Sequence, residues 1–357
     1  MRAAILTAVD LPLELVELEA SPLGDRDARV RIEASGVCHS DLSVINGSIP
    51  YPPPIILGHE GAGAVVEVGS AVTRVKPGDR VIASFTPTCG RCGPCLRDES
   101  HLCTDYAAFT QSKGKLPDGR KVRGMSGLGT FSDEIRLHED SLVPIRSDLP
   151  TEQLALIGCG ATTGLGAALN TAQIRAGHTV AIVGCGGVGL FALMGAVLAG
   201  ASRVIAVDLD PSKLDAAAKL GATDLVDPGN GATPDQIKEL TAGSGVDHCV
   251  EVVGSPATMK DAIDSTRRGG TTTFVGMPPM SSEITLPAYT FFYEAKTIKG
   301  CFYGSAQVRR DFQRWIDLAE AGRIDLGAVI SHRYPLDDIN TAIDDLSAGK
   351  VLRAVIT

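Results

Sequence analysis

The sequence predicts an α/β protein in which a β-rich part is joined to a doubly wound parallel sheet. Its 357 residues exceed the roughly 250–300 at which one hydrophobic core stops growing, so two domains are expected. Up to about residue 150, short alternating segments are separated by turn residues, and afterwards apolar strands alternate with helical segments. Such alternation implies parallel βαβ units, whose strands are buried on both faces.

Alternation of apolar and polar residues predicts the strands of the first part, and glycine and proline predict its turns. The expected strands are residues 28–34 and 62–68 and the segment that follows Pro77-Gly78-Asp79 up to residue 82.

In the second part, apolar runs predict strands at residues 180–183, 203–208, 224–226, 247–253 and 271–276. Helices are expected up to residue 199 and at residues 211–220 and 234–241. The tail holds an amphipathic helix at 308–322 and a strand-like end at 352–356, whose packing the pattern does not settle.

Composition excludes several classes of protein. A net charge of -9 and a pI near 5.3 oppose nucleic-acid binding, which usually needs a basic face. The apolar stretch 180–201 is interrupted by glycines, so it predicts a buried core element rather than a membrane span. The N-terminal residues do not resemble a signal peptide, so a cytoplasmic location is expected. There, nine cysteines are reduced thiols that point to metal or catalysis before disulfides.

Four cysteines are closely spaced: Cys89, Cys92 and Cys95 stand at intervals of three, and Cys103 follows. Zinc prefers four thiolates in a tetrahedron at structural sites, and the glycines and proline between the cysteines let the loop curl. The alternatives are an iron–sulfur cluster and a group of redox-active thiols, but the Cys-Pro of ferredoxin-type clusters is missing. We expect a closed, structural zinc site.

The run Gly184-Cys185-Gly186-Gly187-Val188-Gly189 matches G-x-G-x-x-G, follows a predicted strand and opens a predicted helix. This is the context of a Rossmann dinucleotide site, in which the pyrophosphate rests on the helix N-terminus. Asp208 ends the next strand, where a carboxylate binds the adenosine ribose hydroxyls and repels a 2′-phosphate. The sequence therefore predicts NAD rather than NADP.

Three further motifs offer metal ligands: Gly36-Val37-Cys38-His39-Ser40-Asp41, Gly58-His59-Glu60 and Gly158-Cys159-Gly160. Taken singly, each cysteine or histidine is as well explained by ordinary core packing. With Lys76-Pro77-Gly78-Asp79-Arg80-Val81, the four cysteines and the glycine loop, however, they resemble the zinc-containing alcohol dehydrogenases of the medium-chain dehydrogenase/reductase superfamily, in the same order and over nearly the whole chain.

The resemblance implies a GroES-like catalytic domain at residues 1–160, completed by 303–357, and an NAD-binding Rossmann domain at 161–302. It implies a catalytic zinc held by Cys38, His59 and Cys159, with one position left open. Glu60 stands beside that metal as a possible alternate ligand, and Asp41 orients the zinc-bound histidine.

Residues that contact cofactor and substrate also follow from the resemblance. Ser40 bridges the substrate oxygen and the nicotinamide ribose. The expected cofactor contacts, besides the glycine loop and Asp208, are His39, Thr163, Lys213, Val275 and Arg353. The expected substrate pocket, apolar and suited to a medium or large primary alcohol, comprises Ile49, Phe85, Ala108, Met125 and Phe302.

One departure concerns proton transfer, because Ser43 stands where many members have a histidine that ends the relay to solvent. We expect a relay completed by water. The implied activity is reversible hydride transfer between an alcohol and NAD, in a homodimer joined through a strand near residues 291–303. The alternatives are a thiol-dependent formaldehyde dehydrogenase on the same scaffold, a zinc-free reductase and a non-catalytic NAD-binding protein.

Overall fold

The computed structural model describes residues 1–105 and 107–357, without the side chains of Ala107 and Ala108. The chain divides into two compact units. The first unit comprises Met1–Gly160 with Gln307–Thr357, and the second comprises Ala161–Ala306. The predicted α/β fold class is confirmed, with a wholly parallel sheet in the second unit.

The first unit contains two sheets. One sheet has the order β2-β1-β5-β9-β8-β3. Its strands are β1 Arg2–Leu6, β2 Glu14–Glu17, β3 Glu19–Ala20, β5 Ile55–Ile56, β8 Ser112–Lys115 and β9 Lys121–Gly124. The other has the order β11-β7-β6-β4-β19-β18, and β10 also pairs with β4. Its strands are β4 Asp27–Val37, β6 Glu60–Val68, β7 Arg80–Ala83, β10 Glu134–His138, β11 Leu142–Pro144, β18 Ile330–Tyr334 and β19 Arg353–Ile356.

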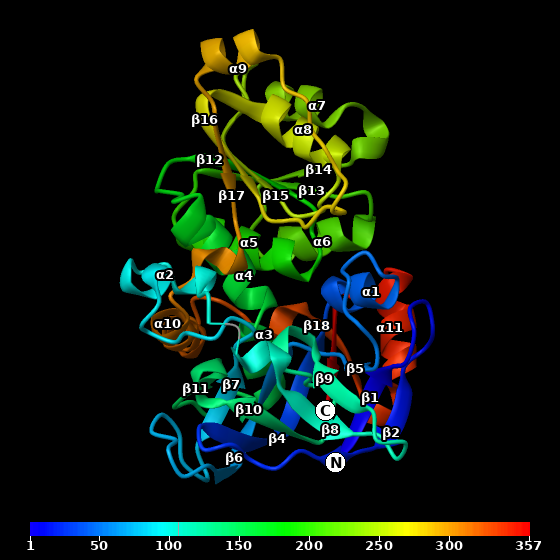
Figure 1. Cartoon of the computed structure of the whole chain (residues 1–357). Coiled ribbons are helices and arrows are strands. Elements are labelled where there is room, and N and C mark those ends of the chain that lie inside the picture. Colours follow the sequence, from blue (N-terminus) through cyan, green and yellow to red (C-terminus); the bar gives the residue numbers. More distant parts are fainter. Residues whose placement is uncertain (106) are drawn as a thin grey trace. The chain divides into compact units, whose positions relative to one another are not determined.

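The C-terminal tail completes the second of these sheets. β19 lies antiparallel to β4, with Ala354 opposite Val37 and Ile356 opposite Ser35. The helices of the first unit are α1 His39–Ile45, α2 Gly93–Leu96, α3 Thr151–Ile157, α10 Val308–Glu320 and α11 Ile339–Ser347. Figure 1 shows α11, in red, beside the blue N-terminal helix α1, and the two share a core with Val37 and Val44. The start and the end of the chain therefore fold as one body.

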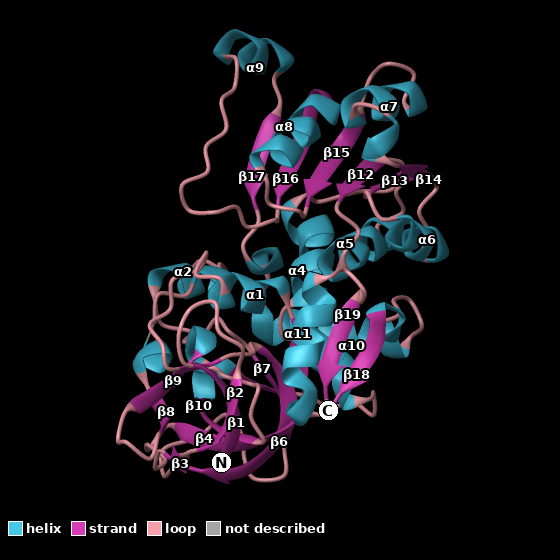
Figure 2. Ribbon diagram, turned by 90° about the vertical axis from the view of Figure 1, so that its right-hand side faces the viewer, coloured by secondary structure: helices cyan, strands magenta, loops and turns pink. Residues whose placement is uncertain are grey.

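In the second unit the strand order is β14-β13-β12-β15-β16-β17, visible across the sheet in Figure 2. The strands are β12 Thr179–Val183, β13 Arg203–Val207, β14 Asp224–Val226, β15 Val246–Glu251, β16 Thr266–Phe274 and β17 Thr297–Gly300. The helices are α5 Gly187–Leu198, α6 Pro211–Lys219, α7 Thr233–Leu240, α8 Pro256–Ser265 and α9 Ala288–Glu294, and α4 Gly160–Gly166 leads into the unit. In chain order this is the Rossmann pattern 3-2-1-4-5-6, with α5 and α6 on one face and α7 and α8 on the other.

The segment 291–303 differs from the single strand expected for it. Its first part belongs to α9, and only Thr297–Gly300 forms a strand. Tyr289, Phe292 and Tyr293 stand at helical spacing, and the Tyr289 and Tyr293 rings stack with centroids 6.1 Å apart. Ala295 adopts the left-handed backbone conformation, with φ of 49°, and ends the helix. The strand β17 therefore begins only at Thr297.

Among the described residues, no single helix is long and apolar enough to cross a membrane. One bent pair, Thr151–Ile157 with Gly160–Thr171, reaches that length and composition only when its two helices are counted together.

Candidate active site and metal centres

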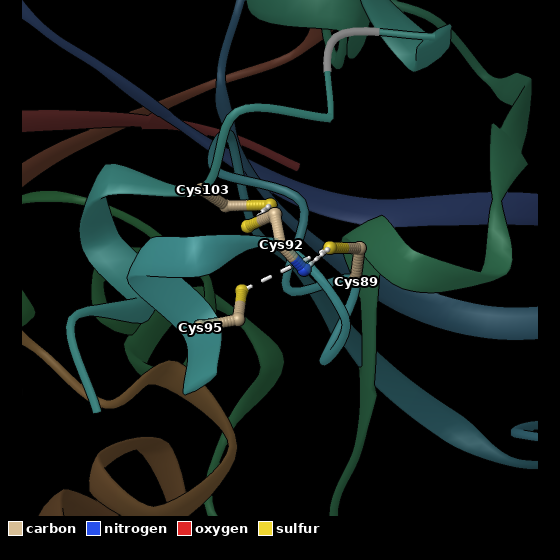
Figure 3. A group of neighbouring side chains, drawn as sticks. All are labelled: Cys89, Cys92, Cys95 and Cys103. Carbon is tan, nitrogen blue, oxygen red and sulfur yellow. Dashed lines mark hydrogen bonds between the residues drawn. The ribbon is translucent and has the colours of Figure 1, made fainter. Parts of the chain in front are cut away.

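The four closely spaced cysteines converge. Figure 3 shows their sulfur atoms facing a common centre, with Cys95 carried by α2. Cys89 Sγ lies 3.9 Å from Cys95 Sγ, and Cys92 Sγ lies 3.8 Å from Cys103 Sγ. Four thiolates at about 2.3 Å around a tetrahedral zinc stand about 3.8 Å apart, so this spacing fits a Cys₄ zinc site and is far too long for disulfides.

Backbone amides prepare this loop for negative charge. Burial alone would raise the pKa of the Cys92 thiol, but backbone N–H groups of Thr104 and Cys95 lower it to about 6. The N–H groups of Arg91 and Cys92 point at Cys89 Sγ, at 3.5 and 3.4 Å. Thiolate is the form that binds metal, so the backbone favours the ligand state at Cys92, whereas burial raises the pKa of Cys95 and Cys103.

A second group of ligand atoms forms from distant segments. Cys38, His59, Glu60 and Cys159 each offer one ligand atom, these atoms lie within 4.8 Å of one another, and all four residues are buried. Two thiols, an imidazole and a carboxylate form a donor set typical of catalytic zinc. The structure thus brings together the three ligands and the alternate ligand that the resemblance implies.

The end of β4 and the start of α1 place Cys38. Its backbone N–H donates to Asp41 Oδ2 at 2.9 Å, so Asp41 caps the helix on which it stands. Asp41 Oδ1 accepts from Gly58 N–H at 3.1 Å and lies 3.4 Å from His59 Nδ1. This carboxylate ties the Cys38 segment to the His59 segment, and it leaves His59 Nε2 as the nitrogen available to a metal.

Glu60 at the start of β6 forms a buried ion pair with Arg353 at the start of β19, through Oε1 and Nη2. Arg353 also donates to the carbonyl oxygen of Val37 at 3.1 Å. Two glycines make room for the pair: a Cβ at Gly36 would lie 2.1 Å from Glu60 Oε2, and one at Gly160 would lie 2.4 Å from Arg353 Nη2. Larger residues there would displace the pair.

The electrostatics of this group are those of a metal site. The Cys159 thiol donates to Cys38 and, with help from Arg353, holds the pKa of Cys38 well below its ordinary value. The same hydrogen bond and burial raise the pKa of Cys159 well above its ordinary value. Burial would lower the pKa of His59, but Asp41 outweighs it and raises that pKa well above 6.5. Burial raises the pKa of Glu60 to about 7, although Arg353 opposes the shift. A divalent cation is the partner that would let both thiols lose their protons together.

One buried atom supports the same interpretation. Within the described part of the chain, Glu60 Oε2 has no partner that meets hydrogen-bond geometry. Buried polar atoms are normally satisfied, and exceptions gather at functional sites. The residues present therefore fit zinc.

The glycine loop of the second unit has the geometry of a dinucleotide site. Gly184 has φ of +94°, and a Cβ at Gly189 would lie 1.8 Å from the Gly184 carbonyl oxygen. A Cβ at Gly186, the residue before α5, would meet no atom within 4 Å, so this position is open to a ligand. Only glycine permits the turn and the close packing of helix on strand.

Asp208 follows β13 beside this loop. Its carboxylate accepts from Cys185 N–H at 2.7 Å and from Asp210 N–H at 3.0 Å, and Lys213 Nζ lies 4.0 Å away. These contacts fix the carboxylate next to the first glycine turn, where the ribose of a dinucleotide is expected. The structure thus brings Asp208, Lys213 and the glycine loop together.

Other expected contact residues lie as follows. His39 is exposed and Ser40 is half-buried on α1, where Ser40 Oγ stands 3.8 Å from Cys38 Sγ. Thr163 on α4 and Val275 after β16 are half-buried in the second unit. Arg353 is 3% exposed and paired with Glu60 as described.

The expected pocket residues have different surroundings. The Phe85 ring meets the His59 ring edge-on, with centroids 5.9 Å apart. Ile49 packs against the core cluster that contains buried Met125. Phe302 belongs to the second unit and is 55% exposed. Ala108 falls in the turn Ala107–Thr110, and its side chain lies outside the described residues.

The sequence did not reveal the Glu60–Arg353 pair or the space that Gly36 and Gly160 provide for it. The signal was present, because both glycines stand two residues or fewer from a ligand cysteine in the quoted motifs.

Comparison with known proteins agrees with this geometry. Residues 24–147 match the family described as alcohol dehydrogenase GroES-like domain, and residues 187–321 match the family described as zinc-binding dehydrogenase. A protein of Photobacterium damsela subsp. piscicida named S-(hydroxymethyl)glutathione dehydrogenase is 38% identical in an alignment that covers 99% of each chain.

Two solved structures are similar over the same length. One is an alcohol dehydrogenase zinc-binding domain protein from Burkholderia ambifaria, with a TM-score of 0.93 and 32% identity over 99% of this chain and 98% of that one. The other is benzyl alcohol dehydrogenase from Acinetobacter calcoaceticus, with a TM-score of 0.91 and 30% identity over the same shares.

Proposed function

Because the chain belongs to the zinc-containing alcohol dehydrogenases of the medium-chain dehydrogenase/reductase superfamily, we propose that it interconverts a primary or secondary alcohol and its aldehyde or ketone with NAD, at a zinc ion held by Cys38, His59 and Cys159. The observation that carries this proposal is the buried group of four ligand atoms within 4.8 Å. Cys89, Cys92, Cys95 and Cys103 hold the second, structural zinc.

A zinc ion with an open position supplies Lewis acidity, which lowers the pKa of a bound alcohol. Asp41 holds His59 in the orientation that leaves Nε2 for the metal. Ser40, beside Cys38, accepts the proton of the substrate hydroxyl at Oγ and passes it outward. Ser43 stands three residues further along α1, on the same face, and water completes the relay.

NAD is bound by the glycine loop and by Asp208, with Lys213 and Val275 as further contacts. The Asp208 carboxylate, already oriented by two backbone amides, accepts from the ribose hydroxyls. The same negative charge disfavours a 2′-phosphate, which supports NAD over NADP. His39, Thr163 and Arg353 complete the expected contacts.

A medium or large primary alcohol is the proposed substrate. Phe85 supports this choice, because its ring already contacts the ligand His59 and gives the site an apolar wall. Ile49, Ala108, Met125 and Phe302 are the other proposed pocket residues. The oxidation of aromatic and long-chain alcohols should therefore have higher kcat/KM values than the oxidation of ethanol.

A second candidate is favoured by one comparison: the relative at 38% identity is named S-(hydroxymethyl)glutathione dehydrogenase. Such a substrate brings two carboxylates, which need basic side chains for recognition. Turnover of formaldehyde that depends on added glutathione would select this candidate.

Zinc analysis and an NAD-linked activity screen test the proposal together. We expect two zinc ions per chain, activity with alcohols and NAD, and loss of activity but not of the structural zinc in Cys159→Ser. One zinc ion per chain with no activity would favour a non-catalytic NAD-binding protein. Formaldehyde oxidation only with glutathione would replace the alcohol proposal by the second candidate.

A homodimer is proposed through the β17 edge of the second unit. β17 pairs with β16 on one side, and the described residues provide no strand on its other side. Nearby, Tyr289 is 77% exposed and Phe292 is 81% exposed. Exposed aromatic side chains beside an open strand edge fit a second copy of the chain. Phe292→Asp should lower the mass measured by sedimentation velocity to that of one chain, and Leu96→Asp, at a leucine of the first unit that is 72% exposed, should not.

A further inference from the structure

Arg80 occupies the first position of β7, in the motif Lys76-Pro77-Gly78-Asp79-Arg80-Val81. A tight turn delivers it there: Gly78 has φ of +88°, and Asp79 Oδ2 accepts from Lys76 N–H at 3.0 Å. The proposed chemistry uses none of these residues. The motif therefore needs a separate explanation, and the contacts of the Arg80 side chain supply it.

The Arg80 guanidinium donates to three acceptors in the segment that enters α3. They are the carbonyl oxygen of Ser147, the carbonyl oxygen of Leu149 at 3.1 Å and Thr151 Oγ1 at 3.1 Å. Thr151 is the first residue of α3, and its hydroxyl donates in turn to Glu33 on β4 at 3.3 Å. The planar fork of a guanidinium fixes several acceptors at once, which an ammonium group does not. Arg80 thus sets the position at which α3 begins.

The other end of β7 fixes the end of α3. A Cβ at Gly158, the residue that closes the helix, would lie 3.1 Å from the Ala83 carbonyl oxygen and 3.3 Å from Glu60 Cα. The four residues of β7 span about 10 Å, and so do the seven residues of α3. The two ends of α3 therefore both touch β7, its start at Arg80 and its end at Ala83, while the body of the helix packs on β4 and β6.

Cys159 follows Gly158 directly, so the position of α3 on β4, β6 and β7 decides where its sulfur lies. Residues 154–157 of α3 are fully buried, and the helix has no room to shift without repacking. A zinc–sulfur bond is about 2.3 Å long and tolerates only a few tenths of an ångström. A small displacement of α3 would thus be felt at the metal.

We propose that Arg80 is a positioning residue for the catalytic metal site: by holding the start of α3 it places Cys159 opposite Cys38 and His59. The inference rests on the proposed role of Cys159 as a zinc ligand. It assigns to the Lys76–Val81 motif the task of setting the geometry of a ligand that lies 79 residues later in the chain.

The test measures each metal site separately in the purified, zinc-loaded protein. The protein is incubated with the chelator 4-(2-pyridylazo)resorcinol and N-ethylmaleimide, and alkylation of individual cysteines is followed by peptide mass spectrometry. Loss of the catalytic metal exposes Cys38 and Cys159, whereas loss of the structural metal exposes the four closely spaced cysteines. This readout does not depend on enzyme activity.

Three variants are compared with the parent. Arg80→Met removes the fork and the charge, Arg80→Lys keeps the charge alone, and Thr151→Val removes one acceptor while the chain keeps Arg80. Arg29→Met is the matched control, because Arg29 is a largely buried arginine of the same sheet whose partner is Glu67 on β6. If Arg80→Met does not fold, Thr151→Val and Arg80→Lys carry the test.

We expect alkylation of Cys38 and Cys159 to become about tenfold faster in Arg80→Met and less so in Arg80→Lys and Thr151→Val, a range typical of residues that support metal ligands. The alkylation rates of the four closely spaced cysteines should equal those of the parent in every variant. In Arg29→Met the rates at Cys38 and Cys159 should also equal those of the parent. Equal acceleration at all six cysteines, or rates within twofold of the parent at Cys159, would overturn the inference. If Cys159 of the parent reacts equally fast with and without chelator, Cys159 binds no zinc, and the proposed catalytic zinc site is itself wrong.

Discussion

Glu60 and Arg353 form an ion pair whose side chains are 0% and 3% exposed, in a space left by Gly36 and Gly160. The pair stands beside two ligand cysteines, and Arg353 comes from the last strand of the chain. Removal of one partner leaves a buried charge without compensation, which typically costs about 3–5 kcal/mol.

We therefore expect Glu60→Gln and Arg353→Met each to lower the free energy of unfolding by about 3 kcal/mol. The double variant should recover part of that loss, since it leaves no unpaired charge. Guanidinium unfolding at fixed zinc concentration measures the effect. The exposed pair Arg333–Glu152 is the control, and its disruption in Arg333→Met should cost less than about 1 kcal/mol. Equal costs for the two pairs would contradict the prediction.

Asp41→Asn should weaken zinc binding at the catalytic site about 10–100-fold, because the amide cannot orient His59 and balance its charge as the carboxylate does. Competition with a chelator, read as zinc content per chain, measures the change. The Cys₄ site of the same molecule is the internal control and should keep its zinc. Unchanged zinc content at equal chelator concentrations would show that Asp41 has no such role.

Asp208→Ser should raise kcat/KM with NADP relative to NAD by at least about tenfold, since it removes the negative charge that repels a 2′-phosphate. Steady-state kinetics with both cofactors provides the comparison. Asp210→Ser serves as control because serine keeps the helix cap that Asp210 gives to α6. A preference for NAD that survives in Asp208→Ser would mean that other groups select the cofactor.

Ser43→His should change the pH dependence of kcat, because a histidine three residues after Ser40 gives the relay a group that titrates near neutral pH. The pH–rate profile, measured with one alcohol from pH 5 to 9, tests this. An unchanged profile would count against a relay at this position, whether or not water takes part.

His248 on β15 makes stability depend on pH. Burial, with His178, Lys299 and Arg267 nearby, lowers the pKa of His248 to about 4, although Asp247 opposes the shift. Its Nε2 lies 3.0 Å from His178 Nδ1. The folded state favours the neutral ring. The free energy of unfolding is therefore undiminished above about pH 6.5, and part of it is lost as the pH falls towards 4.

Between pH 6.5 and 4 the free energy of unfolding should therefore fall by about 2–3 kcal/mol less in His248→Gln than in the parent. Urea unfolding midpoints at several pH values measure this difference, and the exposed His332→Gln is the control. Parallel curves for parent and His248→Gln would refute the assignment.

The sequence allowed prediction of features encoded within short segments. The Cys₄ site was predictable because all four ligands lie within one loop. The glycine loop was predictable because strand, turn and helix follow one another directly. Both depend on local geometry, which spacing expresses.

Features that depend on long-range pairing were not predictable in the same way. Cys38, His59 and Cys159 meet because β4, β6 and α3 pack together, and only the resemblance identified them in advance. The Glu60–Arg353 pair requires β19 to lie next to β4, a pairing that no local pattern signals. The strand that the resemblance implied near residues 291–303 is confined to Thr297–Gly300, and residues 291–294 belong to α9 instead.

The two metal sites close loops of very different length. The ligands of the first lie between Cys89 and Cys103, whereas Cys38 and Cys159 of the second are separated by 121 positions. A nascent chain could thus bind its first zinc ion soon after residue 103 leaves the ribosome, while the second site must wait for Cys159 and its neighbouring Glu60–Arg353 pair for β19.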